Sequence, residues 1–172
     1  MRLARRQRGY ITPAMLGIGR RPTAAPYLPS DNPASLIAWF RMGVGVTSSG
    51  GFASQWDDQS GNANHLVQAT GTNQPAYDGS AILTFDGVDN FMNVAFTLNQ
   101  PAQISMLMKQ ITWAGGQTFT SGQTVDMDFV QTYNTSSPDI QLAGSALAAT
   151  NGNLAIGVEE AVSVVFNGVN SS

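Results

Sequence analysis

The chain lacks cysteine altogether and carries little charge, since only 11% of its 172 residues are Asp, Glu, Lys or Arg. The absence of thiols excludes a disulfide, a zinc–thiolate centre and a nucleophilic cysteine. Globular proteins usually have about 25% charged residues, and surface helices normally display Lys and Glu. The polar residues here are mostly Gly, Ser, Thr, Asn and Gln. This composition favours short strands joined by many turns.

Other absences narrow the possible classes of protein. No apolar run approaches the roughly 20 residues that span a bilayer. The basic start of the chain is followed by Gly9–Pro13, which interrupts the apolar segment that a secretory signal requires, so we expect no such signal. His65 is the only histidine, and no Gly-x-Ser-x-Gly elbow accompanies it. A hydrolytic triad is therefore not indicated.

The carboxylates give no clear glycosidase pair. Glu159 and Glu160 are the only glutamates, and adjacent residues of a strand point to opposite faces, so they could not flank one glycosidic bond. Asp126 and Asp128 would share a face, roughly 7 Å apart, a separation compatible with inverting hydrolysis. Simple alternation within Val125–Val130 explains the same two residues as solvent-facing. We expect no enzymatic activity.

Charge divides the chain into two parts. Residues 1–30 contain six of the eight basic residues and no acidic residue, which gives them a net charge of +6. Residues 31–172 contain two basic and eleven acidic residues, a net charge of −9. The first part also holds four prolines and no sustained hydrophobic period, so it is predicted to be an extended arm. The second part is predicted to be the folded body.

The basic arm (residues 1–30) has several possible roles. Its charged and apolar residues suit docking onto an acidic protein surface. Nucleic-acid binding is disfavoured because the acidic body would oppose the approach of DNA, and a membrane-surface helix is disfavoured by the proline and glycine content. A solvated tail is the remaining alternative. The candidate anchoring residues are Arg2, Arg5, Arg6, Arg8, Tyr10, Ile11, Met15, Leu16, Arg20 and Arg21.

The body has a mostly β pattern. Leu36–Phe40 is predicted to be a buried strand, and Ile104, Met106 and Met108 alternate as one face of another. Further strands are expected at Val125–Val130 and at Ala161–Phe166, where Val162, Val164 and Phe166 share a face. Joints rich in Asn, Gly and Ser separate these runs at intervals of roughly 10–15 residues, which favours an all-β antiparallel sandwich.

A series of short motifs occurs in a fixed order along the body. The series consists of Trp39, Trp56-x-Asp58-x-Ser60-Gly61, Gln74-Pro75, Phe85-Asp86-Gly87 and Phe166-Asn167-Gly168. It resembles the concanavalin A-like (laminin G-like) jelly-roll domains of bacteriophage structural proteins and bacterial surface proteins. The match is best over Leu36–Phe91 and returns more weakly at Val162–Ser171, whereas residues 99–160 contribute little to it.

The resemblance implies a jelly-roll β-sandwich over residues 31–172 and a non-catalytic role in a virion. A capsid decoration, head-fibre or tail-associated subunit, assembled in the host cytoplasm as a homo-oligomer or larger assembly, would contact other virion proteins through its arm. The alternative is a carbohydrate-binding adhesin or lectin module at the cell surface that recognises a host glycan. In the family, further strands usually follow a turn like Phe166–Ser171, so we expect a truncated chain or a sandwich completed by another element.

Two sets of body residues are candidate ligand sites. Trp113, Tyr133 and Asn134 combine aromatic rings with an amide, as glycan-binding sites do. Some members of the family bind calcium at a rim, and oxygen ligands in turns would be needed here. The candidates are Asp57, Asp58, Asp86 and Asp89. Aspartate is equally a default turn residue, so we expect no cofactor and keep calcium as the alternative.

Overall fold

The computed structural model covers residues 1–172 and describes residues 28–112, 118–122, 128–131, 139–143 and 147–166. The chain divides into two units, residues 1–36 and 37–172. In the first unit the structure describes two 3₁₀ turns, η2 (Pro29–Asp31) and η3 (Pro33–Ser35). The candidate anchoring residues of the basic arm all lie outside the described residues, so their role stays a prediction.

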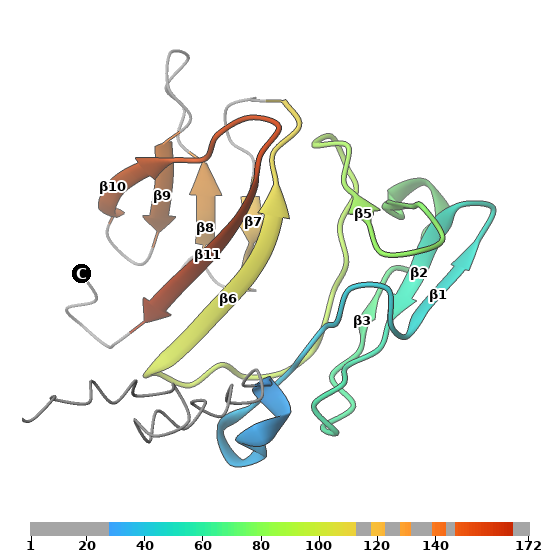
Figure 1. Ribbon diagram of the computed structural model, residues 1–172, viewed down its shortest axis with the longest axis horizontal. Coiled ribbons are helices and arrows are strands. Elements are labelled where there is room, and N and C mark those ends of the chain that lie inside the picture. Colours follow the sequence, from blue (N-terminus) through green and yellow to red (C-terminus); the bar gives the residue numbers. More distant parts are fainter. Residues whose placement is uncertain (1–27, 113–117, 123–127, 132–138, 144–146, 167–172) are drawn as a thin grey trace, which may run out of the picture. The chain divides into compact units, whose positions relative to one another are not determined.

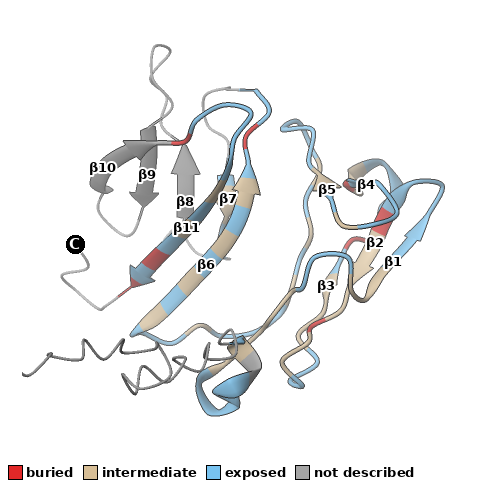
Figure 2. Ribbon diagram, in the orientation of Figure 1, coloured by how far each residue is buried: buried red, intermediate tan, exposed pale blue. Residues whose placement is uncertain are grey.

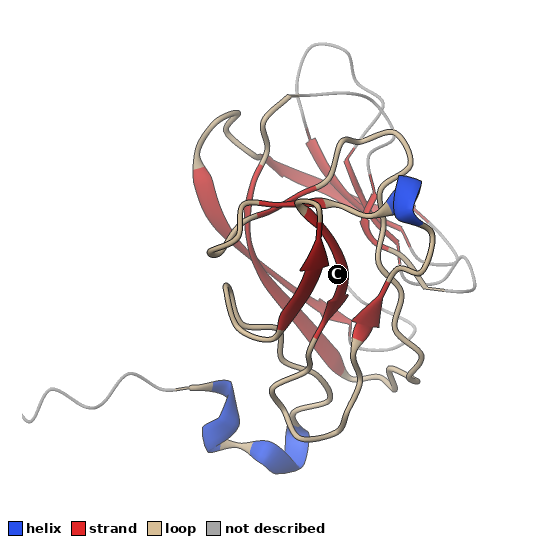
Figure 3. Cartoon of the chain, turned by 90° about the vertical axis from the view of Figure 1, so that its right-hand side faces the viewer, coloured by secondary structure: helices blue, strands red, loops and turns tan. Residues whose placement is uncertain are grey.

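The second unit is built from antiparallel strands, which confirms the all-β prediction (Figure 3). The only helical element described in it is a 3₁₀ turn, η4 (Gly71–Asn73). A first sheet has the strand order β1-β2-β4-β5, with β3 also paired to β2 (Figure 1). Its strands are β1 (Val46–Ser49), β2 (Phe52–Trp56), β3 (Leu66–Val67), β4 (Ala76–Tyr77) and β5 (Leu83–Thr84).

Two further sheets follow along the chain. One has the order β10-β9-β8-β7, and the other is the two-stranded ribbon β11-β6. The ribbon strands are β6 (Ala102–Lys109) and β11 (Glu159–Phe166). The strands of the four-stranded sheet are β7 (Thr118–Thr120), β8 (Asp128–Gln131), β9 (Asp139–Ala143) and β10 (Leu147–Asn153).

The ribbon is the most regular part of the described fold. Every residue of β6 pairs with one of β11, from Lys109 opposite Glu159 to Ala102 opposite Phe166. Burial alternates along both strands, as Figure 2 shows for β6. Because side chains alternate between the faces of a strand, one face of the ribbon is covered and the other is exposed.

The covered face contains the main apolar cluster. Val164 and Phe166 are buried there, and they pack against half-buried neighbours from the ribbon and from β7. The predicted inward faces of the β6 and β11 segments are therefore confirmed. The half-buried neighbours are Ile104, Met106, Met108, Phe119 and Val162.

The fully buried apolar residues at the first sheet are small. Ala53 and Pro75 are fully buried, and the Ala53 N–H donates to the Pro75 carbonyl at 3.0 Å. Phe52 on the same strand as Ala53 remains about half exposed. Gly45 has φ +71°, and a Cβ built on it would lie 2.6 Å from Cβ of Asp57. Glycine is therefore required at this close approach.

The predicted strand at Leu36–Phe40 is wrong. Residues 36–39 form no strand, and only Phe40 makes an isolated antiparallel bridge, to Asp58. The apolar run misled the prediction because the backbone here is held mostly by side chains of a distant turn, with one main-chain bond from the Gln59 N–H to the Trp39 carbonyl at 2.7 Å. Of the strand predicted at Val125–Val130, residues 128–130 belong to β8, and residues 125–127 lie outside the described part.

Candidate functional site

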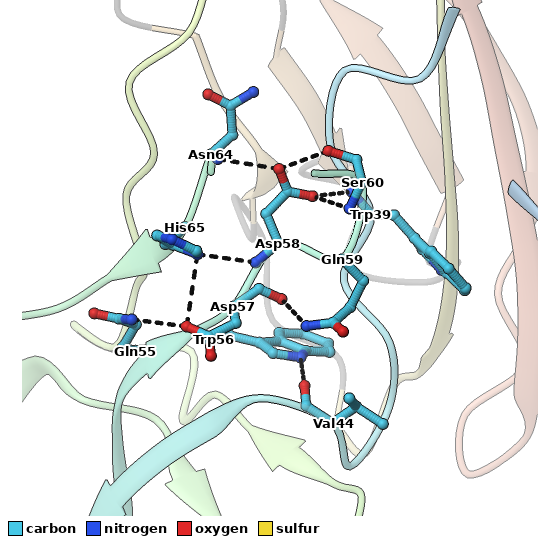
Figure 4. Close-up of polar contacts among 10 residues, drawn as sticks. All are labelled: Trp39, Val44, Gln55, Trp56, Asp57, Asp58, Gln59, Ser60, Asn64 and His65. Atoms are coloured by element: carbon cyan, nitrogen blue, oxygen red, sulfur yellow. Dashed lines mark hydrogen bonds and ion pairs between the residues drawn. The ribbon is translucent and has the colours of Figure 1, made fainter. Parts of the chain in front are cut away.

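The most elaborate polar site of the described structure is the turn that follows β2 (Figure 4). Trp56 ends the strand, and its indole Nε1 donates to the carbonyls of Arg41 at 3.1 Å and Val44 at 3.2 Å. Its ring lies against Phe40, with the ring centroids 5.6 Å apart and the planes at 49°. These contacts fix the strand end from which the turn departs.

Asp58 is the centre of this turn. Its side chain is almost fully buried, with 8% of the residue exposed. Oδ1 accepts the backbone N–H groups of Trp39 and Ser60, both at 2.8 Å. Oδ2 accepts the Ser60 hydroxyl at 2.7 Å and the Asn64 N–H at 3.0 Å. Both carboxylate oxygens are thus surrounded by hydrogen-bond donors.

The environment of Asp58 favours its ionised form. Burial alone would raise the pKa of the carboxyl, because it disfavours the charge. The Ser60 hydroxyl and the N–H groups of Trp39, Ser60 and Asn64 together outweigh burial and lower the pKa below its usual value. With two donors on each oxygen, the Asp58 carboxylate joins the turn to the Trp39 main chain as a hydrogen-bond acceptor.

The same turn also holds the backbone carbonyl of Ile37. The Asn64 amide donates to it at 2.8 Å and the Asn62 amide at 3.1 Å. Gly61 lies in this turn with φ +93°, a conformation that favours glycine. Asp58 and the two asparagines therefore bind the Ile37–Trp39 segment through hydrogen bonds to its main-chain groups.

His65 takes part as a hydrogen-bond acceptor. Its Nδ1 accepts the Asp58 N–H at 3.1 Å, and the same nitrogen lies 3.5 Å from Oδ1 of Asp57. The two contacts need opposite states of Nδ1, and the shorter one requires it to be unprotonated. The His65–Asp57 contact is partly exposed, and such ion pairs contribute little. Nδ1 of His65 thus ties the residue to the turn by accepting the Asp58 N–H.

Two further aspartates, in exposed turns, also accept backbone N–H groups with their carboxylates. Oδ1 of Asp78 accepts the N–H groups of Ser80, Ala81 and Ile82 at 2.8, 2.8 and 3.0 Å. Oδ1 of Asp86 accepts those of three following residues at 2.9, 3.3 and 3.3 Å: Val88, Asp89 and Asn90. These backbone hydrogen bonds lower the pKa of both carboxyls. Asp78 was not singled out by the sequence.

Gln68 is a buried polar residue that sequence reasoning missed. Its Nε2 donates to the Phe91 carbonyl at 3.0 Å, and its Oε1 accepts the Thr70 N–H at 3.0 Å. The Gln74 side chain donates to the backbone carbonyl of Gln68 at 2.9 Å. No sequence signal separates this glutamine from the exposed ones, because its role depends on segments that meet only in the fold.

The four calcium candidates are divided between two turns, Asp57 with Asp58 and Asp86 with Asp89. In the described part of the chain no three His, Asp or Glu residues are grouped so that they could hold a metal ion. Asp58 and Asp86 accept backbone N–H groups, as the turn-capping alternative requires. Calcium binding at these residues remains a prediction.

Other candidates can be placed only in part. Trp113, Tyr133, Asn134 and Asp126 lie outside the described residues, and Asp128 is described by its backbone alone, in β8. Glu159 and Glu160 alternate in exposure on β11, which confirms that they face opposite sides. Within the described ranges there is no helix whose length and hydropathy would let it cross a membrane.

In comparisons with known proteins, no family model, no curated protein and no solved structure matches this chain.

Proposed function

We propose that this chain is a non-catalytic structural protein of a bacteriophage virion, with a concanavalin A-like jelly-roll body that its basic arm anchors to the particle. The observation that carries the proposal is the division of charge, +6 in residues 1–30 and −9 in residues 31–172. Such a division suits a subunit whose arm binds another protein while its body stays apart from anionic surfaces. A capsid decoration, a head fibre and a tail-associated subunit all meet this description.

The chemistry of the described body supports a structural role. Its buried carboxylate, Asp58, is fully engaged by hydrogen-bond donors. The histidine next to it accepts a backbone N–H and faces no hydroxyl nucleophile among the described contacts. Groups of this kind fix a fold, whereas a catalytic acid or base must reach a substrate proton.

The arm has the chemistry of an anchor. Arginine makes paired hydrogen bonds with carboxylates and is frequent at protein interfaces. Tyr10, Ile11, Met15 and Leu16 add apolar side chains between the arginines. A segment that the sequence predicts to be extended can cover a long surface of a partner.

Co-sedimentation with purified source particles tests the proposal. The full chain should travel with the particles, and a full-length variant with the six arm arginines replaced by glutamine should remain in the supernatant. Circular dichroism of the variant checks that its body is folded. Equal sedimentation of both chains would contradict anchoring by the arm.

The carbohydrate-binding alternative becomes the leading one if neither chain travels with the particles. A glycan screen then tests it directly. A binding signal that is lost in Trp113→Ala and kept in the arginine-to-glutamine variant would support a lectin module.

A further inference from the structure

The loop Phe85–Phe91, here called the acidic loop, exposes an unusual combination of side chains. Val88 at its centre is 85% exposed, and Phe85 and Phe91 at its ends are each nearly half exposed. Asp86 and Asp89 between them are exposed as well. Seven consecutive residues thus present three apolar side chains and two carboxylates.

This exposure does not come from a loosely held segment. The Asp86 carboxylate accepts three N–H groups of the loop, and the Asn90 side chain accepts the Asp86 N–H at 3.1 Å. At the base, the Phe91 N–H donates to the Asn73 carbonyl at 3.1 Å, and the buried Gln68 amide donates to the Phe91 carbonyl at 3.0 Å. A loop that is already ordered loses little conformational entropy when it binds a partner.

The chemistry of the loop defines its partner. Among the described residues no hydrogen bond or ion pair engages the Asp89 carboxylate, so it is available to an external cation. Apolar side chains beside carboxylates are complementary to a segment in which arginines alternate with aliphatic and aromatic residues. Arginine also binds the face of an aromatic ring, which Phe85 and Phe91 provide.

We propose that the acidic loop of one copy binds residues 1–21 of the basic arm of a second copy. Those residues carry all six arm arginines together with Tyr10, Ile11, Met15 and Leu16. Every copy then contributes both an arm and a loop, so two copies can exchange arms, or the contact can repeat head-to-tail around a ring or along an array. This inference rests on the proposed function, in which the arm is the anchor, and it identifies the neighbouring subunit as the surface that receives it.

Binding of a labelled peptide tests the contact. A fluorescent peptide of residues 1–21 is titrated, with anisotropy as the readout, into the full-length chain whose six arm arginines are glutamine, so that the chain's own arm does not compete. We expect saturable binding that weakens at least about fivefold in Val88→Ser, as expected for a central interface residue. Asp89→Asn should weaken it about twofold to fivefold, with an effect that shrinks as salt rises.

Matched variants elsewhere on the body show whether the loss of peptide binding is specific to the acidic loop or follows from removing any exposed valine or carboxylate. Val158 is half exposed and Glu159 is exposed, and both lie outside the acidic loop. Val158→Ser and Glu159→Gln should bind the peptide within about twofold of the parent. Absence of saturable binding, or an equal loss in these controls, would overturn the proposal.

Sedimentation of the unmodified chain distinguishes a second copy from the chain's own loop. Association that rises with concentration and is lost in Val88→Ser is expected. A chain that stays monomeric while its arm competes with the peptide would place the arm on its own loop and overturn the contact between copies. Particle binding that depends on the arginines but is unchanged in Val88→Ser would leave the proposed function standing and refute this inference alone.

Discussion

The Asp58 turn and the β6–β11 ribbon are stabilised in opposite ways. In the ribbon, eight paired residues on each strand form a regular ladder, and alternate side chains enter an apolar cluster. Around the Asp58 turn, the Ile37–Phe40 segment is held by a carboxylate and amides that bind main-chain groups. Apolar burial dominates one region, and hydrogen bonds to side chains dominate the other.

The difference shows that the side chains of a polar turn can satisfy main-chain hydrogen-bonding groups that a neighbouring strand would otherwise satisfy. A neighbouring strand satisfies main-chain groups with other main-chain groups. Here Asp58 and Asn64 satisfy the Trp39 N–H and the Ile37 carbonyl instead. Such a region depends on a few residues, whereas the ribbon distributes its stability over many. Three perturbations separate the two mechanisms.

Removing the Asp58 carboxylate should have the largest effect. Asp58→Ala leaves the N–H groups of Trp39 and Asn64 without their acceptor inside the fold, and we expect a loss of about 4 kcal/mol in the free energy of unfolding. Asp57→Asn is the matched control and should cost about 0.5 kcal/mol, because Asp57 is partly exposed. Urea unfolding followed by tryptophan fluorescence measures both. Equal losses would show that the turn does not depend on this one acceptor.

Substitutions in the ribbon should reduce the free energy of unfolding somewhat less. The reduction should depend on whether the substituted residue lies on the covered or the exposed face. Phe166→Ala removes a buried ring from the apolar cluster and should cost about 3 kcal/mol. Val165→Ala on the exposed face should cost about 0.5 kcal/mol or less, since Val165 is half exposed. Thermal unfolding of the two variants is the measurement. Similar costs at the two positions would contradict the assignment of the covered face.

Lowering the pH should also distinguish the two regions, and its effect on the free energy of unfolding should be the smallest of the three. The pKa of Asp58 is lowered in the folded state, so its contribution is present above the unfolded pKa of about 3.9 and is lost as pH falls through the lower folded value. The stability difference between the parent chain and Asp58→Asn should therefore shrink below about pH 4. Phe166→Ala provides the comparison, because its cost arises from packing and should stay constant over the same range.

The predictability of each region follows from the kind of contact that forms it. The alternation at Ile104–Met108 and at Val162–Phe166 is a local signal, so it correctly predicted strands and their inward faces. At Leu36–Phe40 a similarly apolar run predicted a strand that does not form. Its main-chain partners come from a turn about 20 residues away, and no local pattern reveals them.

The turn itself was predicted in part. Asp58 and Asp86 were predicted to lie in turns, and both accept N–H groups of the residues that follow them. The burial of Asp58, its four donors and the role of Gln68 were not predictable, because each depends on segments brought together by the fold.

The hydrogen bonds of the Asp58 turn also determine an order of events during synthesis. Among the described contacts, the main-chain groups of Ile37 and Trp39 find their partners only at residues 58–64. Between about 20 and 27 further residues must therefore be translated before this segment can be fixed. The first part of the body to be translated therefore stays without these partners until the turn that binds it has formed.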